Sequence, residues 1–168
     1  MIKTRRTDSV MCDFSIENLK IPIFSFSEIF RFREKLTNLA GIYSFLWNGD
    51  KNLIKDANLK FVLKGSKNKE HESKYWTYGD PVFLYIGKST NFYKRFLLHR
   101  RPSAKSGHQL FKGIKELFPE ECNEKLIEII NKNISVSYIL IEDFVERFYA
   151  ENKAIGDLRP WFNVDCER

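Results

Sequence analysis

The framework of the fold is set by one apolar run, Gly41-Ile42-Tyr43-Ser44-Phe45-Leu46-Trp47. Apolar and aromatic side chains dominate the run, and Asn48-Gly49, a pair typical of tight turns, closes it. The pattern predicts a β-strand that ends in a turn.

Two further runs of the same kind predict strands that can pair with the first. Residues 82–86, Val-Phe-Leu-Tyr-Ile, follow Pro81 and end at Gly87, and residues 134–141 form a third apolar run. A short strand is also expected at residues 59–63. Residues 64–73 have the polar composition of a loop.

Helical periodicity is found in the stretches between and after these strands. Ser27 can cap a helix that runs to Leu36, with Ile29 and Phe32 on its apolar side. The remaining helices are expected at residues 91–100, 109–118, 123–132 and 143–158. Pro119 separates the second from the third of these, and Pro160 stops the last.

The expected fold class is α+β, with a small, mainly antiparallel sheet of three to four strands flanked by helices. A chain of 168 residues suits one domain with a proper core. We divide it into an N-terminal arm and helix over 1–38, with residues 1–20 polar and without periodicity, and a main domain over 39–168. Residues 48–80 differ in character from their flanks and form an insertion between the first two core strands.

The composition favours a polyanionic partner such as DNA. The formal net charge is +6, and lysines and arginines displace counterions from a phosphate backbone. The three cysteines, Cys12, Cys122 and Cys166, lie far apart, which argues against a disulfide framework and favours the cytoplasm. No apolar run approaches the ~20 residues that span a bilayer, so a membrane partner is not expected.

One carboxylate breaks the apolar pattern of the last expected helix. At about 100° per residue, Phe144, Phe148, Ile155 and Leu158 fall within about 80° of each other and predict a buried stripe. Glu151 lies inside this stripe, and an unpaired buried carboxylate costs several kcal/mol. It is therefore either a structural partner of a buried arginine, or a metal ligand or general base at the floor of a cleft.

The helix at 91–100 presents two cationic or donor side chains beside an apolar face. Phe92 and Phe96 mark that face, and Arg95 and His99 are neighbours one turn apart. Such a pair suits a phosphate or its transition state, whereas the alternative is a surface arginine beside a half-buried histidine. His108, in a Ser-Gly-His turn, is a third candidate.

Together these residues carry a resemblance. Gly41-Ile42-Tyr43 followed by Tyr85-Ile86-Gly87 resembles the signature of the GIY-YIG nuclease superfamily. The order of the later motifs is similar too: an Arg-x-x-x-His on the next helix (Arg95 and His99), a glutamate (Glu151), and a Pro-x-x-Asn that ends at Asn163. His108 resembles a second histidine of some homing-type members.

The resemblance implies a GIY-YIG-like domain and hydrolysis of DNA phosphodiesters with one divalent metal, Mg²⁺ or another cation such as Mn²⁺. It implies that Glu151 holds the metal, that Arg95 binds the scissile phosphate, and that Tyr43 deprotonates or positions the attacking water. Tyr85, His99 and Asn163 would complete the hydrogen-bonded site. Because a lone carboxylate binds Mg²⁺ weakly, we expect the ion to be loosely held without DNA.

The interval between the two tripeptides departs from the family, whose members mostly join these strands by a short hairpin. Here 41 residues lie between Tyr43 and Tyr85. The leading hypothesis is a stand-alone endonuclease of the restriction, mobile-element or phage kind. The alternatives are a structure-specific or excision-repair nuclease, which could be the catalytic domain of a longer protein, and a non-catalytic nucleic-acid-binding protein that keeps the fold. Cutting both strands of a duplex takes two cleavages, which favours a homodimer for a restriction enzyme.

Overall fold

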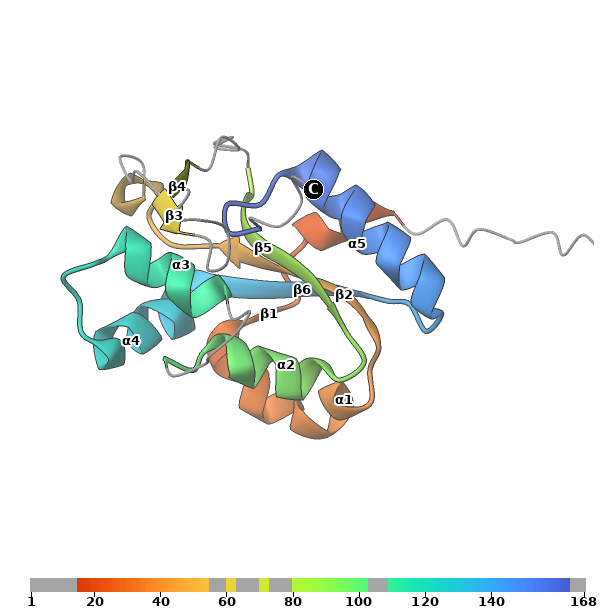
Figure 1. Ribbon diagram of the computed structural model, residues 1–168. Helices are drawn as coiled ribbons and strands as arrows, with labels where there is room; N and C mark the ends of the chain where they lie inside the picture. The colour runs from red at the N-terminus through yellow and green to blue at the C-terminus, as the bar shows by residue number, and fades with distance from the viewer. Residues whose placement is uncertain (1–14, 55–59, 63–69, 73–79, 103–108, 164–168) are drawn as a thin grey trace, which may run out of the picture.

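The computed structural model describes residues 15–54, 60–62, 70–72, 80–102 and 109–163. This part of the chain is an α+β structure whose main sheet has four antiparallel strands in the order β1-β6-β2-β5 (Figure 1). The strands are β1 (Phe24–Ser25), β2 (Gly41–Trp47), β5 (Val82–Ser89) and β6 (Ile134–Leu140). The three strands expected from the longest apolar runs are therefore confirmed, and β1 is the fourth.

β2 is an inner strand, hydrogen-bonded to β5 on one side and to β6 on the other. All seven of its residues are buried, which explains why the run is so uniformly apolar. Gly41 is required at its start, because an added Cβ would lie 1.9 Å from the carbonyl oxygen of Ile139 on β6.

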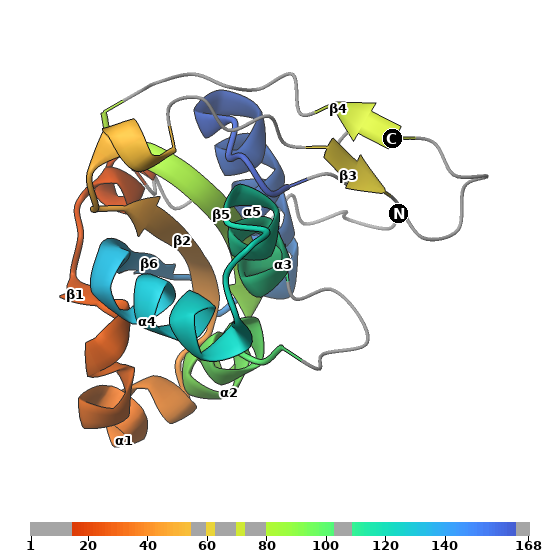
Figure 2. The ribbon, with the colours of Figure 1, turned by 90° about the vertical axis from the view of Figure 1, so that its left-hand side faces the viewer.

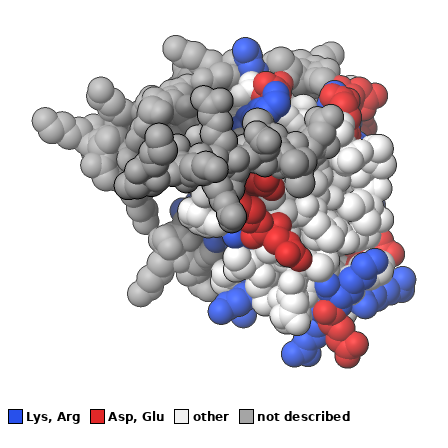
Figure 3. Space-filling view, turned by 90° about the vertical axis from the view of Figure 1, so that its right-hand side faces the viewer, with Lys and Arg blue, Asp and Glu red and all other residues white. Residues whose placement is uncertain are grey.

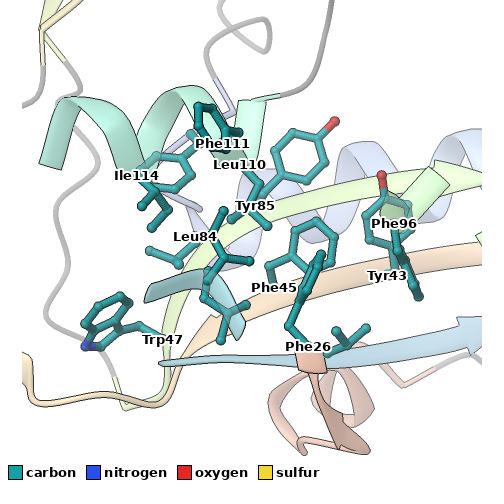
Figure 4. Packing of buried hydrophobic residues seen from close by; sticks show 14 of the residues in the cluster. Phe26, Tyr43, Phe45, Trp47, Leu84, Tyr85, Phe96, Leu110, Phe111 and Ile114 are labelled. Carbon is teal, nitrogen blue, oxygen red and sulfur yellow. The ribbon is translucent and has the colours of Figure 1, made fainter. Parts of the chain in front are cut away.

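Helices cover both faces of the sheet, with α5 (Phe144–Leu158) above it and α1 (Arg33–Thr37), α2 (Phe92–His99) and α4 (Asn123–Asn133) below it in Figure 1. α3 (Gln109–Leu117) packs against α4, as the turned view also shows (Figure 2). Alternate residues of β2 face the two layers. Tyr43, Phe45 and Trp47 belong to the larger cluster, which Figure 4 shows from close by, and Ile42 and Leu46 belong to the cluster beneath α5.

The N-terminal part is packed more closely than its sequence indicates. The expected arm over residues 1–20 includes a 3-10 helix, η1 (Ile16–Lys20), whose Leu19 is fully buried. Ser44 on β2 donates a hydrogen bond to the Leu19 carbonyl, and Ser137 on β6 donates one to Asn18. These bonds attach the segment to the sheet.

The helix expected from Ser27 to Leu36 begins earlier and has two parts. Residues 26–32 form a 3-10 helix, η2 (Phe26–Phe32), and only the following α1 is α-helical. The capping residue is Ser25 rather than Ser27, because the Ser25 side chain and Glu28 form a capping box. Ile29 and Leu36 are buried as expected.

Between β2 and β5 lie the short helix η3 (Lys51–Leu53) and a separate two-stranded antiparallel sheet, β3 (Lys60–Val62) with β4 (Glu70–Glu72). The expected strand at 59–63 is thus confirmed. Residues 64–73 are not loop throughout, because β4 lies within them. In the described part of the chain, no helix has the length and apolarity needed to cross a membrane.

The stripe expected for α5 is wrong in its first half. Phe144 is 65% exposed and Phe148 48% exposed, whereas Arg147, Ala150 and Ala154 are buried beside Ile155. The two alanines let the helix axis approach the sheet closely, so small residues rather than the large phenylalanines form the contact face. Hydrophobicity alone cannot distinguish these two faces.

Candidate active site

Tyr43 is the centre of a buried hydrogen-bonded cluster. Its hydroxyl oxygen lies 2.8 Å from Nε2 of His99 and accepts a hydrogen bond of 3.2 Å from Nε of Arg95. Tyr43 and His99 are both completely buried. The Arg-x-x-x-His pair of α2 therefore meets Tyr43 of β2 at the phenol oxygen.

Helix α2 positions this pair because its own sequence fixes both its start and its buried face. The Asn91 side chain caps the helix by accepting from the Lys94 backbone N–H at 2.9 Å. Phe92 and Phe96 are fully buried against the sheet, and their rings pack edge-on against the Tyr43 ring. Because Arg95 and His99 are one turn apart on the same helix, this anchoring also fixes their positions.

Tyr85 completes the cluster from the neighbouring strand β5. Its ring lies 4.8 Å from the His99 ring and 6.1 Å from the Tyr43 ring, centroid to centroid, and it is 8% exposed. Gly87, two residues further along the same face, makes room for the cluster. A Cβ at Gly87 would lie 2.6 Å from the Tyr43 hydroxyl.

Both tyrosine hydroxyls are held in their neutral form. Burial raises the pKa of Tyr43 well above its usual range, and Tyr85 and the charge of Glu151 raise it further, while Arg95 opposes them. Burial also raises the pKa of Tyr85, again against Arg95. Tyr43 is therefore a phenol, not a phenolate, at neutral pH. The negative charge of Glu151 also raises the pKa of Tyr85.

Glu151 reaches the site from α5 and is paired with a lysine. Its side chain is 14% exposed and forms a salt bridge with the ammonium group of Lys88, which is 32% exposed. The ammonium also lies 5.1 Å from the centre of the Phe148 ring. The structural partner considered for Glu151 was a buried arginine, but the buried Arg147 instead donates to the Ile141 carbonyl.

Asn163 fixes the end of β5 through the backbone. Its side-chain oxygen accepts from the Ile86 N–H at 2.8 Å, and its side-chain nitrogen donates to the Ile86 carbonyl at 2.7 Å. The two preceding residues, Trp161 and Phe162, also bond to β5 through their N–H groups. Only an amide side chain can both accept and donate in this way. Asn163 is thus a positioning residue for the strand that carries Tyr85 and Lys88.

The structure brings together most of the residues that the motifs single out. Tyr43, Tyr85, Arg95 and His99 form one cluster, and Asn163 supports it through β5. Glu151 is bonded to Lys88 of the same strand β5. His108 lies outside the described residues.

Sequence reasoning missed Lys88. The signal that could have found it is the period-two alternation of a strand. Ile86 faces the cluster beneath α5, so Lys88 faces α5 too, which is the side from which Glu151 projects.

Among the candidate site residues in the described part of the chain, Glu151 is the one carboxylate that could ligate a metal ion. Within the described ranges, no group of three or more His, Cys, Asp or Glu side chains could hold a metal ion. A single carboxylate is too little for a structural zinc site, but Mg²⁺ keeps several waters and shares oxygens with substrate phosphates. Glu151 fits that second pattern.

In comparisons with known proteins, no family model, curated protein or solved structure matched this chain.

Proposed function

We propose that this protein is a metal-dependent DNA endonuclease of the GIY-YIG type, which hydrolyses phosphodiester bonds. The single observation that supports this most is the convergence of Arg95 and His99 on the Tyr43 hydroxyl. The charge of the Glu151 carboxylate acts on the same hydroxyl. A guanidinium, a neutral phenol with a proton acceptor, and a carboxylate are the groups that hydrolysis of a phosphodiester needs.

Arg95 would bind the scissile phosphate. Its guanidinium is partly exposed, and its Nε bond to the Tyr43 hydroxyl orients the planar group. A fixed guanidinium stabilises the charge that develops on the phosphoryl oxygens more than it stabilises the substrate.

Tyr43 would relay a proton rather than act as a preformed phenolate, because its pKa is raised well above neutrality. The attacking water would have to enter beside the buried Tyr43 hydroxyl. One of its protons then passes to the Tyr43 oxygen while the Tyr43 hydroxyl proton passes to Nε2 of His99. The distance of 2.8 Å suits this second transfer. The water oxygen then bonds to phosphorus, the bond from phosphorus to the leaving oxygen breaks, and that oxygen takes a proton from solvent. His99 returns its extra proton to solvent, which restores the starting state.

Glu151 would hold the divalent cation, Mg²⁺ or Mn²⁺, which when bound supplies Lewis acidity to the phosphate and acidity to its water ligands. In this structure the same carboxylate forms a salt bridge with Lys88. The ammonium group must therefore release Glu151, at least in part, when the cation binds. Lys88 would then lie within reach of the DNA strand.

The test is cleavage of supercoiled plasmid, linear duplex, branched and single-stranded DNA with and without Mg²⁺. We expect Mg²⁺-dependent strand cleavage by the wild type and its loss in Glu151→Ala. Glu142→Ala, which removes an exposed carboxylate just before α5, is the matched control and should cleave normally. Equal cleavage by wild type and Glu151→Ala would refute the role of Glu151, and DNA binding without any cleavage would identify a non-catalytic binding protein.

The same panel separates the restriction-type and repair-type alternatives. Fragments of defined length from linear duplex would indicate a site-specific enzyme. Preference for the branched substrate would indicate a structure-specific one.

A further inference from the structure

Along the sequence, basic residues outnumber acidic ones most clearly in the stretch that contains α2. Residues 81–115 contain no aspartate or glutamate, although they contain eight basic residues: Lys88, Lys94, Arg95, Arg100, Arg101, Lys105, Lys112 and Lys115. α2 lies at the centre of this stretch and carries the Arg95 of the candidate site. A segment of 35 residues with one sign of charge produces a local field that attracts polyanions.

The solvent side of α2 displays part of this charge. Lys94 in α2 and Arg101, two residues beyond the end of the helix, are both exposed. Arg95 projects from one flank of the helix toward Tyr43.

The opposite flank of α2 is joined to α1 and η2 by two reciprocal arginine–aromatic contacts. Arg33 of α1 lies 5.7 Å from the centre of the Tyr93 ring, and Arg100 lies 4.9 Å from the centre of the Phe30 ring. Phe30 is 50% exposed, so this contact is at the surface. Stacking on a ring restricts a guanidinium, and the loss of conformational entropy on binding an anion is then smaller.

The spacing of the two arginine–aromatic contacts along α2 is comparable to the spacing of nucleotides in a DNA strand. Tyr93 and Arg100 are separated by about 10 Å along the helix axis, at 1.5 Å per residue. That distance corresponds to the rise of about three nucleotides of one strand. Nearby carboxylates are few: Glu28 lies near Arg31 in η2, and Glu34 is exposed in α1.

The other exposed face near the site has the opposite character. At the start of α5, Glu142 and Asp143 are exposed, and Phe144, Phe148 and Tyr149 form an apolar surface beside them. Figure 3 shows carboxylates near the middle of this face and several Lys and Arg side chains nearer its lower margin, where a carboxylate also lies. Carboxylates repel phosphates, so a DNA backbone is favoured on the α2 side.

We propose that Lys94, Arg101, Arg100 and Arg33, here called the α2 ridge, bind the phosphodiester backbone of DNA outside the scissile phosphate. The ridge guides the strand across α2 to Arg95. This inference rests on the proposed nuclease function, because it takes DNA as the substrate.

The experiment measures binding of the full chain to a fluorescent DNA duplex in EDTA, between 50 and 200 mM salt. Log affinity falls with log salt, and each phosphate contact contributes about 0.9 to the steepness of that fall. Lys94→Ala with Arg101→Ala should therefore make the fall shallower by about two. The affinity ratio of wild type to variant then falls about tenfold over that salt range. The control is Lys51→Ala with Lys153→Ala, which removes two exposed lysines, on η3 and α5, and should leave the slope unchanged.

A second variant tests the stacked arginines. Arg33→Ala with Arg100→Ala should lower the slope in the same way, whereas Arg33→Lys with Arg100→Lys keeps the charges and should retain most of the slope. The ridge would be overturned if Lys94→Ala with Arg101→Ala left the slope unchanged. It would also be overturned if the slope changed no more than in the control Lys51→Ala with Lys153→Ala. A cleavage assay on the same duplex is independent of this result. If the ridge fails, the wild type can still cleave, and if the nuclease function fails, the slopes still report whether the ridge binds DNA.

Discussion

Tyr43 and His99 are joined by a hydrogen bond of 2.8 Å between the phenol oxygen and Nε2 of the imidazole, although 56 residues separate them in the chain. Both side chains are completely buried, and the same oxygen accepts from Arg95. The side chains of Arg95 and His99 on α2 therefore both hydrogen-bond to the Tyr43 oxygen on β2, which is the strongest reason to treat the three as a single chemical unit.

Removing that oxygen should abolish the relay. We expect Tyr43→Phe to lower the single-turnover cleavage rate about 10²- to 10⁴-fold, the usual contribution of a general acid–base group, with little change in the DNA dissociation constant. Tyr138→Phe is a suitable control, because Tyr138 pairs with Tyr43 across the sheet on β6. A Tyr43→Phe variant that cleaves within a few-fold of wild type would exclude the relay.

The raised pKa of the two buried tyrosines predicts how stability depends on pH. A group whose folded pKa exceeds its unfolded value, about 10 for tyrosine, stabilises the fold fully below that value. The contribution is lost as the pH rises through 10 toward the folded pKa. We expect the free energy of unfolding in urea to fall between pH 9 and 11, with each tyrosine adding at most about 1.4 kcal/mol per pH unit.

Replacing one of these tyrosines gives the control for that measurement. Tyr85→Phe should reduce the steepness of the decline, whereas Tyr149→Phe, at a position 67% exposed, should leave it as in wild type. Identical pH profiles for Tyr85→Phe and wild type would show that burial of this hydroxyl does not contribute.

Lys88 and a divalent cation should compete for the Glu151 carboxylate. We expect Lys88→Met to tighten Mn²⁺ binding in the absence of DNA by a few-fold, the scale of a partly exposed ion pair, as measured by electron paramagnetic resonance. Lys51→Met removes another ion-paired lysine and should have no effect. Unchanged or weaker Mn²⁺ binding in Lys88→Met would show that the two cations do not share this carboxylate.

Two glycines should respond in opposite ways to the same substitution. Gly87→Ala places a methyl group within 2.6 Å of the Tyr43 hydroxyl, so the ring must move, and a displacement near 1 Å can cost about 10²-fold in rate. Gly156 lies within α5 with nothing within 4 Å of an added Cβ, and Gly156→Ala should stabilise the protein by about 0.5–1 kcal/mol. Thermal unfolding and cleavage rates of the two variants check both statements. Full activity in Gly87→Ala would contradict the close approach.

The amino-acid sequence by itself predicted much of the scaffold, because strands and helices depend on local patterns. The runs at 41–47, 82–86 and 134–141 became β2, β5 and β6, and the helices at 91–100, 109–118, 123–132 and 143–158 lie close to their expected bounds. Proline and capping residues act over only a few positions, so those boundaries are visible in the sequence.

What the tertiary structure alone decided is which side chains meet. Hydrophobicity indicated that Phe144 and Phe148 were buried, but Ala150 and Ala154 form the contact, because a close helix–sheet approach selects small residues. The pairing of Lys88 with Glu151, and of Tyr43 with His99, depends on strands and helices far apart in the chain. In the sequence, Glu151 stood out as a carboxylate within an apolar pattern. Only the packing of α5 against β5 showed that it forms a salt bridge with a lysine, Lys88.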